Sequence, residues 1–199
     1  VLRADRMDSL IFGGAQSAKP LGMAEVSLAF DNSQHTLPID YHEVVVTRRL
    51  YRSGESEYLL NKNPVRLKDI SDLFRMRRNL IAQVRGTSIA AGICGYNQNY
   101  NTYPSNIEKI YGEFIRERAN EDPYSTDYSE FQFRMVNERH AVDTQNGRLW
   151  IEPGTPILWG RGHDHEDQRA RTHSDDGSEG DVVFFPPIKA LSRDQGLLN

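Results

Sequence analysis

The chain of 199 residues is poor in the features that mark secreted, disulfide-bonded and membrane-spanning proteins. Cys94 is its single cysteine, which excludes an internal disulfide and a multi-cysteine zinc site. No apolar run approaches the roughly 20 residues of a membrane helix. Residues 1–20 lack the basic-then-apolar layout of a signal peptide. We therefore expect a cytoplasmic protein with no membrane partner. Because the chain begins with Val and not Met, we also expect its natural start to lie upstream of Val1.

The chain has little excess charge of either sign, with 24 basic and 28 acidic residues, and this charge lies unevenly along the chain. Residues 1–75 are neutral overall, residues 76–100 contain three arginines and no acidic residue, and residues 101–199 have a net charge of −7. The total of −4 argues against a protein that coats nucleic acid, although a local basic contact patch remains compatible with it.

The first third of the chain has the patterns of an antiparallel β-meander that ends in a helix. Residues 24–30 alternate with Val26, Leu28 and Phe30 on one face, which is the period of a strand. Residues 41–51 contain a β-branched run, and Ser53-Gly54-Glu55 is a turn that leads into a returning strand at 57–60. Apolar residues at helical spacing then predict a helix over about 66–75.

The rest of the chain shows weaker patterns. We interpret residues 76–105 as an irregular linker, because they are rich in glycine, asparagine and small side chains. Asn106 is placed to cap a helix that runs to about residue 119. Alternation predicts a strand at 131–136, and further motifs predict an Asn-Gly hairpin at 142–150, a polar flexible loop at 160–181 and a strand at 182–185.

Residues 1–74 resemble the N-terminal lobe of the ATPase head of bacterial SMC (structural maintenance of chromosomes) proteins of the condensin type. Four ordered segments carry the resemblance: Leu2–Gly14 with its M-D-x-x-I-F core, Ala18–Asn32 with K-P-L-x-x-A-E-V, Leu37–Asn61 with L-P-I-D-Y and R-S-G-E-S-E-Y, and Pro64–Phe74 with R-L-K-D-I. The resemblance stops near residue 75, a pattern that a truncation, a fusion or a frame-shifted reading would produce.

The resemblance implies roles for a few residues. Arg3 matches the arginine that couples DNA contact to ATP hydrolysis, and Arg6 matches a basic position that faces DNA. In the complete family ATP and Mg²⁺ are cofactors, and DNA and a second SMC head are partners. Gln83 is a weak match to the glutamine that helps to hold the magnesium, because its spacing is several residues too short. Taken without the resemblance, Arg3 and Arg6 are ordinary surface arginines.

The chain lacks the parts that ATP hydrolysis needs. No Gly-Lys pair occurs, so the G-x-x-x-x-G-K-[ST] loop that wraps phosphates is missing. No apolar run ends in the Asp-Glu pair that would hold magnesium and polarise water. Ser53-Gly54-Glu55-Ser56 resembles the L-S-G-G signature only superficially. We expect the chain alone to bind no cofactor and to have no ATPase activity.

Two constellations in the second half are candidates for other chemistry. His163, His165 and His173 lie among carboxylates and could bind zinc or another divalent ion, although their Gly-rich segment favours a flexible loop. Cys94 with His140 and Asp143 could form a nucleophile set, but a buried structural cysteine explains Cys94 more simply.

We therefore predict a β-rich α+β fold of antiparallel hairpins with a few short helices. The expected organisation is an SMC-head-like lobe at 1–75, a linker at 76–105 and an unassigned α+β segment at 106–199. The leading function is a derivative of an SMC head in chromosome condensation and segregation. The alternatives are a non-enzymatic interaction module and a metal-dependent hydrolase centred on 163–181.

Overall fold

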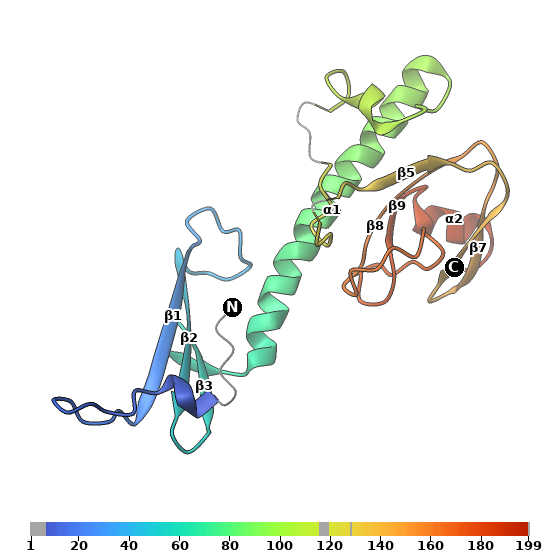
Figure 1. Ribbon diagram of the computed structural model, residues 1–199. Helices are drawn as coiled ribbons and strands as arrows, with labels where there is room; N and C mark the ends of the chain where they lie inside the picture. The colour runs from blue at the N-terminus through green and yellow to red at the C-terminus, as the bar shows by residue number, and fades with distance from the viewer. Residues whose placement is uncertain (1–6, 116–119, 128, 199) are drawn as a thin grey trace. The chain divides into compact units, whose positions relative to one another are not determined.

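The computed structural model describes residues 7–115, 120–127 and 129–198 (Figure 1). The chain divides into two compact units, Val1–Arg77 and Arg78–Asn199. Each unit has its own sheets and its own buried side chains, so the units are described one at a time. The β-rich α+β fold with antiparallel sheets that the sequence predicts is confirmed.

The first unit contains a 3₁₀ turn, η1 (Met7–Leu10), and a four-stranded antiparallel sheet. The strands lie in chain order: β1 (Met23–Asp31), β2 (Glu43–Tyr51), β3 (Ser56–Leu60) and β4 (Asn63–Val65). The predicted meander is confirmed, including the turn at Gly54, whose φ of 89° suits a residue without a Cβ. The short strand β4 was not among the predicted strands.

One face of this sheet forms the buried cluster of the first unit. Its members are Leu37, Val44 and Leu73, with Phe30, Ile39, Val46, Leu60 and Phe74 packed against them. The rings of Phe30 and Phe74 meet edge to face with centroids 5.3 Å apart. Val26 and Leu28 share the face of Phe30 by alternation but remain 59% exposed. The predicted apolar face is therefore only partly covered within this unit.

The register of β2 and β3 places Tyr51 and Tyr58 on opposite faces of the hairpin. Arg48 lies opposite Tyr58, and Arg49 lies opposite Glu57. Because side chains alternate along a strand, Tyr51 shares the face of Arg49, whereas Tyr58 lies on the other face. The Tyr51 hydroxyl donates to Glu57 at 3.1 Å, and the Arg48 guanidinium lies 5.4 Å from the centre of the Tyr58 ring.

Helix α1 (Leu67–Tyr100) begins where the sequence predicts but is 34 residues long. The irregular linker expected at 76–105 is thus wrong as far as Tyr100. The glycines that suggested a loop are contact points: a Cβ on Gly86 would lie 2.5 Å from the Phe184 ring, and one on Gly95 would lie 2.7 Å from the Phe114 ring. Side chains pack directly on the helix backbone there, so tertiary contact overrides the low helix propensity of glycine.

The helix predicted over 106–119 is also wrong in its length. The structure has a 3₁₀ turn, η2 (Ile107–Ile110), and residues 116–119 lie outside the described part of the chain. Asn106 does act as the predicted cap, because its side chain accepts a hydrogen bond from the Lys109 N–H at 3.3 Å. Ile107 and Ile110 are buried, and this burial explains the apolar spacing that suggested a longer helix.

The second unit contains a three-stranded antiparallel sheet, a separate hairpin and a short helix (Figure 1). The sheet order is β5-β8-β9. The elements are β5 (Gln132–Met135), β6 (His140–Thr144), β7 (Gly147–Ile151), β8 (Pro156–Gly160), β9 (Val182–Phe185) and α2 (Ile188–Asp194). The predicted strands at 131–136 and 182–185 and the hairpin at 142–150 are confirmed, whereas the central strand β8 was missed.

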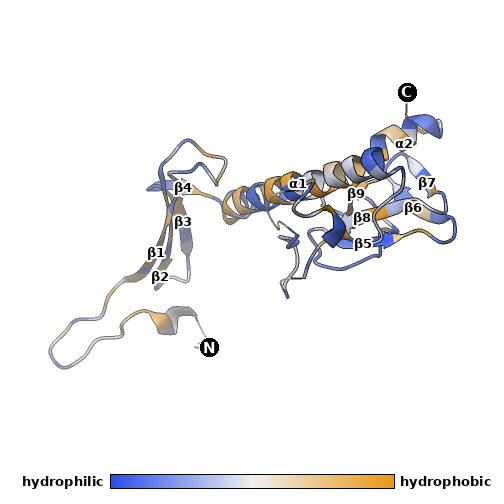
Figure 2. Cartoon of the chain, turned by 90° about the horizontal axis from the view of Figure 1, so that it is seen from above, coloured by the Kyte–Doolittle hydropathy of each residue, from blue (hydrophilic) through white to orange (hydrophobic). Residues whose placement is uncertain are grey.

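Two buried clusters hold the second unit together. One gathers the hairpin, β8, β9 and α2 around Val142, Leu149 and Ile157, and the other packs Ile89 and Ile93 of α1 against Leu158 and neighbouring side chains. Figure 2 shows apolar and polar residues mixed along α1, as expected of a helix that buries only part of its surface. In the described residues, no helix is both long and apolar enough to cross a membrane.

Candidate functional site

Arg3 and Arg6, which the resemblance links to DNA contact and ATP hydrolysis, lie outside the described residues. Their roles therefore stay predictions. Arg49, on strand β2, has two carboxylate partners. Arg49 contacts Glu25 at 2.6 Å and Glu57 at 3.4 Å. Both ion pairs lie on the sheet surface, so Arg49 has a structural role there.

Arg52 lies beyond the end of β2 and contacts main-chain carbonyls. Its Nε donates to the Leu21 carbonyl and its Nη2 to the Phe12 carbonyl, each at 2.7 Å. A charged donor on two main-chain acceptors holds the segment before β1 beside the hairpin turn. Arg52 is thus used structurally.

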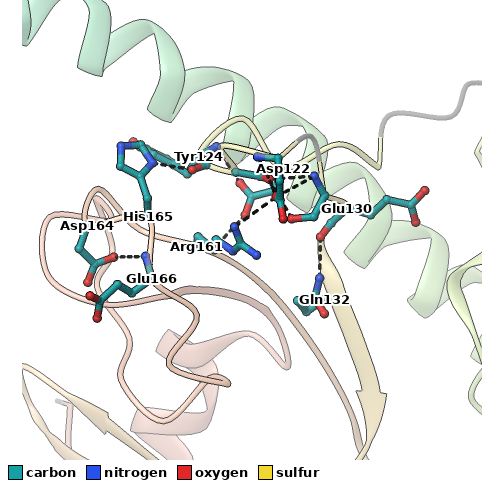
Figure 3. A network of polar contacts seen from close by, with 11 residues as sticks. Asp122, Tyr124, Glu130, Gln132, Arg161, Asp164, His165 and Glu166 are labelled. Carbon is teal, nitrogen blue, oxygen red and sulfur yellow. Dashed lines mark hydrogen bonds and ion pairs between the residues drawn. The ribbon is translucent and has the colours of Figure 1, made fainter.

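Asp122 forms the first buried polar centre of the second unit (Figure 3). One of its carboxylate oxygens accepts from the Tyr124 N–H at 2.9 Å and the other from the Arg161 N–H at 2.6 Å. Burial raises the pKa of the Asp122 carboxyl, while the two backbone donors oppose that rise. Nδ1 of His165 lies 2.6 Å from the Tyr124 carbonyl oxygen. These contacts join the loop after residue 120 to the loop that follows β8.

Asp181 forms the second centre, at the start of β9. The side chain has no solvent exposure and accepts from the Ala170 N–H at 2.8 Å and the Gln168 N–H at 3.3 Å. Burial, reinforced by Asp167 and Asp164, raises the pKa of this carboxyl to about 7. Asp181 therefore organises the loop at 160–181, which lacks regular elements as predicted but has a dense set of internal hydrogen bonds.

The predicted metal candidates point to separate partners. His165 contacts Tyr124, while Nδ1 of His173 accepts from the Val183 N–H at 3.0 Å and its Nε2 lies 3.3 Å from Asp175. The ring of His163 packs 5.7 Å from that of Tyr124. In the described ranges, no group of three or more His, Cys, Asp or Glu side chains is arranged to hold a metal ion. The structure does not bring these three histidines into one site.

The nucleophile set is likewise not formed by the contacts of its members. Cys94 is exposed, which corrects the expectation that it is buried. His140 contacts the Ala170 carbonyl at 2.9 Å, and Asp143 pairs with Arg148 at 2.7 Å. Gln83 donates to the Asp175 carbonyl at 3.2 Å. Each of these side chains has a structural partner or faces solvent.

An open cavity of about 1280 Å³ lies beside the polar loop of the second unit. Its lining is mainly polar and acidic, with Asp143, Asp164, Asp175, Asp176 and Glu179 against Lys189 and Arg193. Such a surface favours cationic over anionic ligands. Sequence reasoning did not find this cavity, because its walls come from residues about 50 positions apart.

The raised pKa of Asp181 makes the stability of the second unit depend on pH. The ordinary value is 3.8 and the folded value is about 7, so between these limits the folded chain binds more protons than the unfolded chain. The contribution of Asp181 to stability is therefore present below pH 4 and is lost as the pH rises to 7. Relative to Asp181→Asn, we expect the parent chain to lose about 3 kcal/mol between pH 4.5 and 7.5, because each pH unit between the two pKa values corresponds to about 1.4 kcal/mol.

Denaturant unfolding of both chains at the two pH values measures this difference. Asp176→Asn is the matched control, because hydrogen bonds from Ser178 and Ser174 lower the pKa of Asp176 to about 2 and it stays ionised over this range. A parent chain and an Asp181→Asn variant with parallel pH profiles would contradict the assignment.

Comparison with known proteins gives the chain its family. The sequence model of the RecF/RecN/SMC N terminal domain matches residues 1–192. The chromosome partition protein Smc of Bacillus subtilis is 62% identical over 73 residues, which are 37% of this chain and 6% of that protein. The Smc of Desulfitobacterium hafniense is 52% identical over 73 residues, with the same shares of both chains. The chain thus spans about 6% of the length of these relatives.

Solved SMC heads show the same partial match. An Smc head bound to the C-winged helix domain of ScpA is 39% identical over 38% of this chain and 23% of that one, with a TM-score of 0.36. The SMC head domain of Thermotoga maritima is 41% identical over 33% of this chain and 22% of that one, with a TM-score of 0.28. On the sequence match to residues 1–192, the chain belongs to the RecF/RecN/SMC N terminal domain family, and its opening residues are an N-terminal segment of an SMC head.

Proposed function

We propose that residues 1–74 serve as the N-terminal lobe segment of an SMC head that acts in chromosome partition. The 62% identity over 73 residues to the Smc of Bacillus subtilis is the observation that carries the proposal. The complete protein would be cytoplasmic, use ATP and Mg²⁺, and have DNA and a second head as partners. The antiparallel meander of the first unit agrees with a lobe that surrounds a nucleotide site built by other segments.

A replacement experiment tests this role. Residues 2–74 would replace the matching segment of Bacillus subtilis Smc, and chromosome partition would be scored by growth and by the fraction of cells without DNA. We expect the hybrid to support growth, and the same hybrid with Arg3→Ala to fail because the guanidinium next to phosphate charge is lost. Lys19→Ala is the control, because the resemblance assigns no role in DNA contact or ATP hydrolysis to Lys19. A soluble hybrid that fails as completely as a deletion would contradict the proposal.

The chain by itself should not hydrolyse ATP. Its sequence lacks the phosphate-binding loop and the carboxylate pair that would hold magnesium. ATP hydrolysis needs these groups because they stabilise the charge of the phosphoryl group during its transfer. Phosphate release by the purified chain is expected to equal the buffer background and to be the same in Arg3→Ala. Turnover that co-elutes with the chain and falls in that variant would show a nucleotide site that the sequence does not contain.

A second candidate, the non-enzymatic interaction module, is favoured by the surface of β1. This strand lies at the edge of its sheet, and its side chains Val26 and Leu28 are 59% exposed. Edge strands with apolar side chains are templates for pairing with another chain. A stable folded monomer that does not respond to ATP would favour this candidate over the first. In the described residues, no group of three or more potential metal ligands supports the hydrolase alternative.

A further inference from the structure

Two exposed histidines, His35 and His42, meet in the loop that joins β1 to β2. Their rings are 5.3 Å apart between centroids, at an interplanar angle of 60°. They are seven positions apart in the chain, so the loop must fold back to bring them together. Neither the proposed function in an SMC head nor the contacts described above assign a role to this pair.

The loop is held closed by a buried residue between them. The His35 N–H donates to the Asn32 carbonyl at 2.9 Å, and the Asn32 N–H donates to the His42 carbonyl at 2.7 Å. Both histidines are therefore attached to the main chain of one residue. Asn32 itself has no solvent exposure, and its amide group contacts the carbonyls of Leu37, Ile39 and Tyr41. The backbone positions of the two imidazoles are thus set before any ligand binds.

We propose that His35 and His42 form a two-histidine site for a divalent transition-metal ion of the class that prefers imidazole ligands. Such ions bind histidine nitrogen at about 2.0–2.1 Å. The ring centre lies roughly 1 Å further, so two imidazoles that share a tetrahedral ion have centres roughly 5 Å apart. The two ring centroids in the structure are 5.3 Å apart, which agrees with this expected distance. Because both side chains are exposed, small rotations about their χ angles can direct a nitrogen of each ring to one ion.

The donor set selects the kind of ion. Imidazole suits Ni²⁺, Cu²⁺ and Zn²⁺, whereas Mg²⁺ and Ca²⁺ require oxygen ligands. No third His, Cys, Asp or Glu completes a cluster with the pair in the described residues, so water would fill the remaining coordination positions. The site is open to solvent, and an ion can enter and leave without movement of the sheet.

Calorimetric titration of the full chain with Ni²⁺ alone tests the site, at pH 8 to keep proton competition low. We expect one saturable event that Mg²⁺ does not reproduce. His35→Asn and His42→Ala should each weaken it at least tenfold. Asn is chosen at position 35 because the φ of 50° there is one that Asn tolerates. The double variant His163→Ala/His165→Ala is the matched control, since it removes the other closely spaced histidines and should leave the affinity unchanged.

A second measurement guards against loss of fold. Ni²⁺ should raise the melting temperature of the parent chain by mass action and have no such effect on His35→Asn or His42→Ala. Melting of the two metal-free variants within a few degrees of the parent shows that the loop is intact. The proposal is overturned if the parent shows no saturable event, if both single variants keep the parent affinity, or if only the control variant loses it.

Discussion

Replacement of Asn32 by Ala is expected to destabilise the first unit by about 3 kcal/mol or more. The side chain is fully buried; its amide nitrogen contacts three carbonyls at 2.7 to 3.3 Å, and its oxygen accepts from the Leu37 N–H at 2.7 Å. Alanine would leave several of these groups buried without a partner, and each such group costs about 1–3 kcal/mol. The loop between β1 and β2 would therefore open.

Hydrogen exchange over residues 30–45 measures this effect locally, because both tryptophans, Trp150 and Trp159, lie in the second unit. Asn63→Ala is the matched control, since Asn63 is exposed and its side chain donates to the Asn61 carbonyl at 3.3 Å. It should change exchange by less than about 0.5 kcal/mol. Equal protection in the two variants would show that Asn32 does not hold the loop.

Replacement of Gly162 by Ala is expected to destabilise the second unit by a similar amount. A Cβ at this position would lie 2.0 Å from the Gly180 carbonyl oxygen and 2.9 Å from that of Gly177. Both obstacles are backbone atoms, so no side chain can move aside. The Gly177 carbonyl also accepts from the His163 N–H at 2.6 Å, and displacement of this segment breaks that contact. We expect a loss of about 3 kcal/mol, as for other overpacked buried sites.

Tryptophan fluorescence during denaturant unfolding reports this loss, because Trp159 lies on β8 just before Gly162 and its Nε1 donates to Asp167 at 2.9 Å. Gly154→Ala provides the comparison: its φ of 84° strains alanine, but nothing lies within 4 Å of the added Cβ. Backbone strain alone costs about 1–2 kcal/mol. A Gly162→Ala variant no less stable than Gly154→Ala would mean that the loop does not pack as described.

Sequence patterns located the strands well because alternation and turn residues act locally. The β-branched run before Tyr51 and the turn at Gly54 are sufficient to predict a hairpin, and the structure contains it. The same local logic failed in α1, where Gly86, Gly92 and Gly95 resemble breakers. Whether a glycine breaks a helix or admits a neighbour depends on what packs against it, and that neighbour can lie a hundred positions away.

The candidate sites also divide into residues that a local motif identifies and residues that only the folded chain brings together. The resemblance to SMC heads identified Arg3 and Arg6 by motif, and family membership is confirmed, but those residues lie outside the described part of the chain. Asp122 and Asp181 were not found as buried centres, because each carboxylate is desolvated by segments that meet only in the folded chain. The two glycines of Gly160-Arg161-Gly162 were a sequence signal for this packing, because a residue without a side chain lets other groups approach its backbone. Asp122 lies close to Gly160, and the Gly180 carbonyl lies close to Gly162.

The sequence by itself determined the family, the antiparallel meander and the absence of a phosphate-binding loop, since motifs and period-two alternation are properties of neighbouring residues. Only the tertiary structure decided the length of α1, the burial of Asn32 and Asp181, and the meeting of His35 with His42. Burial and pairing depend on which distant segments exclude water from a side chain, and no local pattern contains that information.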